Sequence, residues 1–349
     1  MSFTVTVLPA GTRFEVLPNE TVLAAGIRQN VGLPYGCKDG ACSSCKSKLL
    51  EGQVVHREHQ LKALSPEDEA AGSMLTCCAT PLSDLTIQVR TVPGSGEFPV
   101  RKMPCRVLSL SLAAPDVMVL QLQLPTGQPL LYRAGQYIEF LLAGGDRRSY
   151  SMAGIAQPEA EKPTMELHIR HMPGGKFTDQ VFGKLKEKDL LRLEGPFGSF
   201  FLREDSTKPV VLLASGTGFA PMKAIIEHMQ AKGITRETTL YWGCRSLADL
   251  YLHDWVLATM ERMPNLRYVP VLSEPKADDA WTGRTGFVHQ AVMSDLPDLS
   301  GHQVYACGAP VMVDSAQRDL VATCGLLLEE FYADAFTSEA DKHVSPAAK

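Results

Sequence analysis

The sequence lacks a long hydrophobic run and a strong excess of charge of either sign. No window approaches the roughly 18 apolar residues of a transmembrane helix, and the N-terminus lacks the charged start and apolar segment of a signal peptide. A net charge of -5 over 349 residues gives no indication of a nucleic-acid surface. We therefore expect a cytoplasmic protein that binds neither membrane nor nucleic acid and whose cysteines stay reduced.

Aromatic residues are few, at 7%, whereas hydrophobic residues at 45% and charged residues at 21% are ordinary for a globular protein. Because a domain usually has roughly 100–200 residues, the length predicts two or three domains. This composition does not indicate a function, so the function must be sought in local motifs.

Cysteine is scarce as well, with nine in the chain, yet Cys37, Cys42 and Cys45 lie close together in "YGCKDGACSSCKSKL". Such a group could form a disulfide, a zinc site or an iron–sulfur site. Reduced thiols argue against a disulfide, and zinc usually takes two cysteine pairs, each with a gap of about two to four residues. The spacing Cys-x4-Cys-x2-Cys, followed by Cys77 in "MLTCCATPLSDL", instead matches the plant-type [2Fe–2S] pattern.

On these cysteines, residues 1–92 resemble a plant-type ferredoxin domain, which has a β-grasp fold. The resemblance implies that Cys37, Cys42, Cys45 and Cys77 bind the cluster, because the family's last ligand lies in a phrase similar to "LTCCATP". We interpret Cys78 as a small buried neighbour. A zinc site of four thiolates stays open as an alternative, and a colourless protein with zinc and no iron would establish it.

The next segment, "TVPGSGEFPVRKMP", is rich in proline and glycine and predicts a linker at 93–103. Short alternating runs broken by Pro, Gly and Asp then predict an antiparallel β-barrel over residues 104–205. This region contains "RRSYSMA" and, further along, "HIRHMPGGKFTDQV". In this order the two phrases resemble the FAD-binding domain of the ferredoxin–NADP reductase family.

That resemblance implies a role for each residue of the two phrases. Arg148 would contact the FAD pyrophosphate, Tyr150 would stack on the isoalloxazine ring, and Ser151 would hydrogen-bond near the flavin's reactive nitrogen. The family's phosphate loop at a helix start corresponds to Gly175, Lys176, Phe177 and Thr178. The strand before it would line the flavin, mostly through backbone groups, at His168, Ile169 and Arg170.

A third region, 206–338, opens with "KPVVLLASGTGFAPMKAIIEHM", which is typical of a buried strand, a Gly-containing turn and an amphipathic helix. Alternating strand-like and helix-like segments predict an α/β domain with a parallel sheet that binds ligands at the carboxyl ends of its strands. "GTGFAP" is a weak signal by itself, but with "YWGCR" and "CGAP" it resembles the nucleotide domain of the same reductases. The resemblance implies an NAD(P) site at Gly216, Thr217, Gly218, Pro221, Arg245, Cys307, Gly308 and Pro310.

In that family the position of Cys307 lies beside the nicotinamide. Cys307 could instead be a nucleophile, but Gly308 and Pro310 fit a cofactor turn and no nucleophile motif surrounds it. The ending "LEEFYADAFTSEA" is similar to the family's terminal region, which implies that Phe336 covers the flavin and that Asp334 approaches the hydride path. We expect residues 339–349 to form a polar tail.

Together the three modules resemble a ferredoxin-domain flavoprotein reductase, an oxidoreductase that passes electrons from NAD(P)H to FAD, to a [2Fe–2S] cluster and to an external protein. The acceptor could be an oxygenase component, or a deoxysugar dehydrase as for CDP-6-deoxy-Δ3,4-glucoseen reductase. An electron-carrying or redox-sensing module without turnover is a different possibility, which flavin reduction by NADH would exclude. NADH is the expected donor, because Arg245 lacks a basic neighbour in "CRSLADLYL" and Asp249 follows.

Overall fold

The computed structural model describes residues 2–94 and 96–337, so the tail predicted at 339–349 lies outside the described residues. The chain divides into two compact units. The first consists of the described residues up to Val100, together with Phe197–Ser199 and residues 334–337. The second consists of Arg101–Pro196 and Phe200–Ala333, and therefore contains both the predicted barrel and the predicted nucleotide domain.

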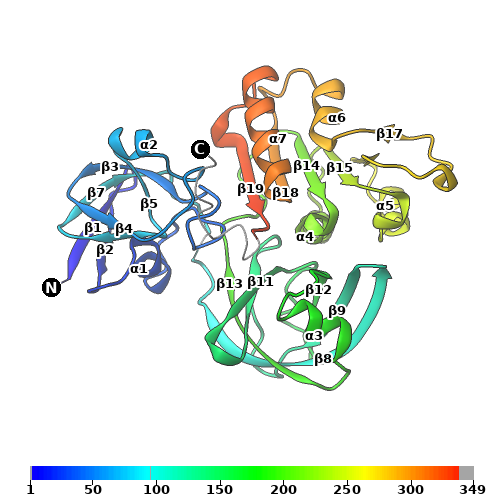
Figure 1. Ribbon diagram of the computed structural model, residues 1–349, viewed down its shortest axis with the longest axis horizontal. Helices are drawn as coiled ribbons and strands as arrows, with labels where there is room; N and C mark the ends of the chain where they lie inside the picture. Colours follow the sequence, from blue (N-terminus) through cyan, green and yellow to red (C-terminus); the bar gives the residue numbers. More distant parts are fainter. Residues whose placement is uncertain (1, 95, 338–349) are drawn as a thin grey trace. The chain divides into compact units, whose positions relative to one another are not determined.

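The first unit has the β-grasp arrangement predicted for a ferredoxin domain. Its elements are β1 (Phe3–Leu8), β2 (Thr12–Val16), α1 (Val22–Arg28), β3 (Lys46–Glu51), β4 (Val54–His56), α2 (Pro66–Ala70), β5 (Ser73–Leu75), β6 (Ala79–Pro81) and β7 (Leu85–Gln88) (Figure 1). The main sheet has the strand order β2-β1-β7-β3-β5, with β1 and β7 parallel. α1 begins at Val22 because the Thr21 hydroxyl accepts a hydrogen bond from the Ala24 N–H at 3.2 Å.

The second unit begins with an antiparallel barrel. Its elements are β8 (Arg101–Ala114), β9 (Val117–Gln123), β10 (Tyr137–Leu141), η1 (Ala143–Gly145), β11 (Arg147–Ser151), β12 (Thr164–Arg170), α3 (Thr178–Gly183) and β13 (Leu190–Phe197). The strand order is β11-β10-β13-β8-β9-β12, and a bridge between Met152 and Leu167 closes the sheet. β8 starts inside the segment predicted as linker, because Arg101 and its neighbours pair with β13 as far as Gly195.

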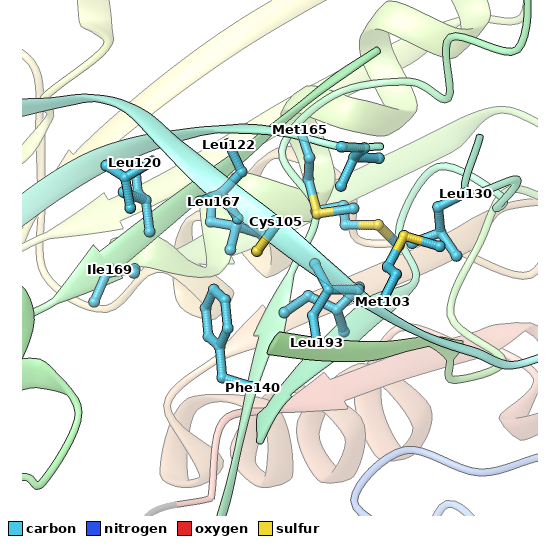
Figure 2. Close-up of a cluster of buried hydrophobic side chains, with 14 of the residues drawn as sticks. Met103, Cys105, Leu120, Leu122, Leu130, Phe140, Met165, Leu167, Ile169 and Leu193 are labelled. Atoms are coloured by element: carbon cyan, nitrogen blue, oxygen red, sulfur yellow. The ribbon is translucent and has the colours of Figure 1, made fainter. Parts of the chain in front are cut away.

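Aliphatic, methionine and aromatic side chains from β8, β9, β10, β12 and β13 fill the interior of the barrel, and Figure 2 shows several of them. Met165, Leu167 and Ile169 of β12 point into this core and are almost completely buried. Successive side chains of a strand point to opposite faces, so Glu166 and His168 point out of the barrel core. This outward face of β12 carries much of the site described below.

The rest of the second unit is a parallel α/β domain. Its elements are β14 (Val210–Ser215), η2 (Gly216–Gly218), α4 (Phe219–Lys232), β15 (Thr238–Cys244), η3 (Leu247–Asp249), α5 (His253–Arg262), β16 (Leu266–Leu272), η4 (Ala277–Asp279), β17 (Arg284–Thr285), α6 (Val288–Asp295), β18 (Gln303–Gly308), α7 (Pro310–Thr323), η5 (Leu328–Glu330) and β19 (Phe331–Ala335). The strand order is β17-β16-β15-β14-β18-β19, and β14 runs parallel to both of its neighbours.

Within the sheet, β15 lies next to β14 on one edge of that strand and β18 lies next to it on the opposite edge, so the direction in which strands are added reverses at β14. In doubly wound sheets such a reversal opens a crevice at the carboxyl ends of the strands, where nucleotides bind. Here those ends carry the Gly216–Gly218 turn, Arg245 after β15, and Cys307 in β18. None of the helices formed by the described residues is both long enough and apolar enough to span a membrane.

Candidate functional site

The cysteine loop of the first unit gathers its thiols in two pairs. In one pair the N–H of Cys37 donates to the Sγ atom of Cys42 at 3.3 Å. In the other pair the Sγ atoms of Cys45 and Cys77 are 3.2 Å apart. A [2Fe–2S] centre takes four thiolates, two for each iron, so the two pairs fit this cluster.

Backbone groups around the first pair also fit a cluster that carries negative charge. The Ala41 N–H donates to the Sγ atom of Cys37 at 3.4 Å. Gly40 has a φ of +78°, and a Cβ there would fall 2.7 Å from the Sγ atom of Cys78, so a larger residue cannot occupy this tight turn. The loop therefore holds its N–H groups close to sulfur, where they stabilise thiolates.

Cys78 is buried and lies beside the second pair, with its Sγ atom 3.6 Å from that of Cys77 and 3.8 Å from the carbonyl oxygen of Glu58. The pairing of Cys45 with Cys77 supports Cys77 as the fourth ligand, which stays a prediction. In the first pair, the hydrogen bond between the two side chains lowers the pKa of the Cys42 thiol and raises the pKa of the Cys37 thiol, so the two sulfur atoms share one proton.

The flavin candidates of the second unit lie on β11. Arg148 and Tyr150 are two positions apart on this strand, so both side chains point to the same face, and Ser151 is buried at the end of the strand. The ring of Tyr150 contacts the ring of Phe177, with the centroids 5.5 Å apart. The strand thus presents a guanidinium and a phenol side by side, which fits recognition of a phosphate and an aromatic ring.

The predicted phosphate loop is a tight turn before α3. A Cβ on Gly175 would lie 2.5 Å from the Oγ1 atom of Thr178, so the turn requires glycine. The Thr178 hydroxyl donates to the carbonyl oxygen of Met172 at 2.8 Å, and Lys176 forms an ion pair with Asp146. Phe177 packs in the barrel core, so it can meet a cofactor only through its backbone.

The outward face of β12 carries a buried polar network. The Nε2 atom of His168 lies 2.8 Å from a carboxylate oxygen of Glu166, and its Nδ1 atom lies 2.9 Å from the hydroxyl of Tyr251. Burial lowers the pKa of His168. Burial would raise the pKa of Glu166, but the hydrogen bond from His168 and the charge of Lys223 lower it to about 2. A neutral His168 therefore donates to the Glu166 carboxylate and accepts from Tyr251.

Lys223 connects this network to the flavin strand. Its ammonium group donates to the carbonyl oxygen of Ala153 at 3.0 Å, just beyond β11, and lies 3.2 Å from Glu166. It also donates to Glu227, one turn further along α4, at 2.6 Å. Lys223 is buried, and these two carboxylates pair with its ammonium group. The cation thereby connects α4, which follows the Gly216–Gly218 turn, to the barrel.

The Gly216–Gly218 turn is packed too closely for side chains. A Cβ on Gly218 would lie 2.2 Å from the carbonyl oxygen of Cys307, so the turn contacts the end of β18. The Trp242 indole N–H donates to the carbonyl oxygen of Gly216 at 2.9 Å, and its ring stacks on Phe219 with the centroids 4.0 Å apart. The turn is thus held in a fixed position by side chains beneath it.

Other nucleotide candidates border this turn. Thr217, Pro221 and Cys307 are buried, and Gly308 has a φ of +138°, which only glycine adopts readily. Pro310 is the first residue of α7. Arg245 follows β15, and 64% of its side chain is exposed. The structure therefore brings together the candidates from the ends of β14, β15 and β18.

Two candidates are grouped differently. Asp334 is buried near the end of β19 and Phe336 follows it, half-buried, and both belong to the first unit rather than to the second. Their predicted roles at the flavin rest on family resemblance.

Sequence reasoning missed Glu166, Lys223, Trp242 and Tyr251 of the candidate site, and also Asp116, which lies 3.2 Å from the Nε atom of Arg170. Two signals could have drawn attention to them. The alternation of β12 predicts that Glu166 shares a face with His168, and Lys223 is a charged residue in the apolar helix that follows the glycine turn. Their partners could not be identified, because the contacts join distant parts of the chain.

Comparison with known proteins identifies three domains in this chain. Residues 5–82 match the family described as "2Fe-2S iron-sulfur cluster binding domain". Residues 104–202 match "Oxidoreductase FAD-binding domain", and residues 212–318 match "Oxidoreductase NAD-binding domain". The cofactors are therefore a [2Fe–2S] cluster, FAD and a nicotinamide nucleotide, and the zinc alternative is excluded.

Relatives match over almost the full length. The CDP-6-deoxy-L-threo-D-glycero-4-hexulose-3-dehydrase reductase of Yersinia pseudotuberculosis is 40% identical, over 96% of this chain and 99% of the relative. Reductase component 1 of the terephthalate 1,2-dioxygenase of a Comamonas species is 35% identical, over 95% and 96%. Among solved structures, the Amycolatopsis cytochrome P450 reductase GcoB is similar with a TM-score of 0.79 and 34% identity, over 96% of this chain and 99% of that one.

Proposed function

Because this chain belongs to the NAD(P)H-dependent iron–sulfur flavoprotein reductases, we propose that it oxidises NADH and delivers the electrons singly to an external protein at the cluster loop. Bound FAD supplies the conversion between a two-electron donor and a one-electron acceptor. The observation that carries this proposal is that the cysteine pairs, the β11 strand and the glycine turn all occur in one chain, each with local geometry that suits its cofactor.

In this proposal β11 holds the flavin. Arg148 neutralises the pyrophosphate of FAD, and Tyr150 offers its ring to the isoalloxazine. Ser151 supplies a hydroxyl near the reactive nitrogen of the flavin. The crowded turn at Gly218 contacts the carbonyl group of Cys307, so a nucleotide held at this turn would have Cys307 near its nicotinamide.

In the first unit, Cys37 and Cys42 would hold one iron, and Cys45 and Cys77 the other. The Ala41 N–H, which points at the Cys37 sulfur, stabilises the negative charge of the cluster. The buried pair of Cys45 and Cys77 would be shielded from water more than the half-buried first pair. Electrons would leave the protein near Cys37 and Cys42.

For the acceptor we propose a sugar-nucleotide dehydrase, as named for the Yersinia relative, because that relative has 40% identity over 96% of the chain. An oxygenase component is the second candidate, since the Comamonas relative has 35% identity over a similar span. Residues 1–92 carry eight Lys or Arg and nine Asp or Glu, so charge should steer the encounter only weakly.

Reconstitution tests both parts of this proposal. The purified protein, with FAD and iron measured, is mixed with NADH and cytochrome c, and then with a purified CDP-hexulose dehydrase or an aromatic-ring oxygenase. NADH oxidation that depends on the added dehydrase supports the first acceptor, and dependence on the oxygenase supports the second. A protein that holds FAD and cluster but does not oxidise NADH with any acceptor would contradict the reductase proposal.

A cytoplasmic location also stays a prediction. It is supported by the four thiolate ligands of the cluster, which must remain reduced before assembly. Immunoblots of cell fractions check it.

A further inference from the structure

A carboxylate of the flavin barrel lies among the cationic groups of the nucleotide site. Asp116 is in the turn between β8 and β9, and its Oδ2 atom is 3.2 Å from the Nε atom of Arg170 and 3.8 Å from an Nη atom of Arg245. Arg170 ends β12 of the barrel, whereas Arg245 follows β15 of the nucleotide domain. The three side chains thus meet where the two parts of the second unit face each other.

Arg170 also contacts the glycine turn. A Cβ on Gly216 would lie 2.6 Å from an Nη atom of Arg170, so the guanidinium rests directly on the turn expected to hold the cofactor's pyrophosphate. The position of Asp116 is held by its backbone, since its carbonyl oxygen accepts from the N–H of His171 at 2.7 Å. The Oδ1 atom of Asp116 is buried and has no hydrogen-bond partner among the described residues. A buried carboxylate oxygen without a partner is uncommon and calls for an explanation.

Arg245 occupies the position that distinguishes NADH from NADPH in doubly wound folds. There, residues beyond the strand next to the glycine-turn strand meet the adenosine ribose, where an acid suits a 2′-hydroxyl and an arginine suits a 2′-phosphate. The backbone of Arg245 is fixed, because its carbonyl accepts from the Glu274 N–H at 2.8 Å. Its exposed guanidinium would favour NADPH if no carboxylate lay near it.

Asp249, the acid that follows Arg245 in the sequence, is already engaged. Its Oδ2 atom accepts from both the N–H and the hydroxyl of Ser246 at 3.0 Å, and it is buried as the cap of η3. The carboxylate that faces Arg245 is instead Asp116, more than a hundred positions earlier in the chain.

We propose that Asp116 is a specificity residue of the nucleotide site, which lets the enzyme select NADH by placing a negative charge beside Arg245. This inference rests on the proposed function. In the free enzyme the carboxylate pairs with both Arg170 and Arg245 and offsets one of their two positive charges. A 2′-phosphate bound at Arg245 would have to displace or approach this carboxylate, whereas a 2′-hydroxyl brings no charge and can donate to it. The pyrophosphate is common to both nucleotides, and Arg170 can bind it in either case.

The test compares wild type with Asp116→Asn, which keeps the shape and removes the charge. The measured quantity is kcat/KM for NADPH divided by kcat/KM for NADH, with ferricyanide as acceptor. Removing one like charge near a phosphate should raise this ratio about 5- to 20-fold, mostly through the KM for NADPH. Asp116→Glu should stay close to wild type. Asp319→Asn, which breaks an ion pair with Arg318 on α7, is the matched control and should leave the ratio unchanged.

A double-mutant cycle identifies the partner. Arg245→Gln should lower the use of NADPH more than that of NADH, and in this background Asp116→Asn should change the ratio much less. Arg170→Gln should weaken both nucleotides alike. An Asp116→Asn enzyme with full FAD and an unchanged ratio would overturn the inference.

Equilibrium binding provides a second readout that does not need turnover. Titration of the oxidised holoprotein with NAD⁺ and NADP⁺ by calorimetry should show that Asp116→Asn selectively tightens NADP⁺. If Asp116→Asn does not retain FAD, the single variant Arg245→Gln tests the inference instead. An equal loss of affinity for NAD⁺ and NADP⁺ in that variant would overturn the inference. Wild-type protein that binds both nucleotides but oxidises neither would contradict the proposed function alone, because the binding ratio could still be measured.

Discussion

The cysteine loop of the first unit and the outward face of β12 in the second unit both bring several polar groups into contact, but over very different lengths of chain. The loop places Cys37, Cys42 and Cys45 within a single turn-rich segment, so their spacing predicts the cluster. On β12, His168 contacts Tyr251, 83 positions away. Local spacing can be recognised without a structure, whereas a contact made by folding cannot.

The difference extends to how each site should fail. The cysteines of the loop serve only to bind the cluster. The loss of one of these ligands should therefore remove the cluster and leave the second unit folded. The β12 network holds protein elements together, so its loss should change stability and flavin chemistry at once.

The largest effect is expected from Cys42→Ser, which replaces a soft thiolate by a poorer ligand. The cluster should be lost, and reduction of cytochrome c by NADH should fall at least about tenfold. Reduction of ferricyanide should persist, because it can draw electrons from the flavin in the second unit. Iron content and the two activities are measured on the same preparation.

Cys78→Ser is the matched control for that variant and should keep iron and both activities. If Cys78→Ser lost the cluster while Cys77→Ser kept it, the fourth ligand would be Cys78. If ferricyanide and cytochrome c activities fell together in every cysteine variant, the two units would not function separately.

The next effect concerns the buried cation of the β12 network. Lys223→Met leaves Glu166 and Glu227 without their shared ammonium group, and breaking a buried ion pair costs roughly 3–5 kcal/mol. The temperature at which FAD fluorescence rises on flavin release should therefore drop by several degrees. Lys232→Met, at the exposed end of the same helix, is the control and should leave it unchanged. Equal midpoints for the two variants would show that the network is not stabilising.

A smaller effect is expected at β11. Arg148→Ala removes a charge-assisted contact to the FAD phosphates and Tyr150→Ala removes ring stacking, each with an expected loss of roughly 1–3 kcal/mol in FAD binding. The dissociation constant is measured by titrating FAD into apoprotein. The cluster should be unaffected, since it lies in the other unit. Full retention of FAD by both variants at high dilution would refute this placement of the flavin.

The smallest effect is a dependence on pH. Burial holds the pKa of His168 below the 6.5 of a free histidine. Just below pH 6.5, His168 is therefore protonated in the unfolded chain but stays neutral in the folded chain. Stability from this group is present above pH 6.5 and is lost as the pH falls below it, by at most about 1.4 kcal/mol per pH unit. Glu166, whose pKa is lowered to about 2, loses its contribution only in stronger acid, as the pH falls from 4.5 toward that value.

Urea midpoints of flavin release, measured between pH 7 and pH 5, should show this slope in wild type and a reduced slope in His168→Gln. An identical slope in both proteins would assign the dependence to another histidine, such as His56 in the first unit, whose pKa burial also lowers.

Sequence reasoning predicted the β-grasp, barrel and parallel α/β folds because each produces a local period or a short motif. Alternation in β12 and the apolar run of β14 are examples of such local signals. The sequence did not single out Asp116, because this residue lies in an ordinary turn. Only the folded structure shows that its carboxylate lies beside Arg170 and Arg245. The sequence offered Asp249 only as an acid near Arg245, and in the structure its carboxylate caps η3, a use with which "SLAD" is also compatible.

The most direct test of the proposed electron path is to follow the cluster during reduction by NADH, with and without FAD. The cluster is observed by electron paramagnetic resonance in holoprotein and in protein stripped of flavin. NADH should reduce the cluster in holoprotein, should fail to do so in the stripped protein although dithionite succeeds, and should succeed again once FAD is returned. Reduction of the cluster by NADH without FAD, or its absence in holoprotein that retains both cofactors, would contradict the electron path proposed for this chain.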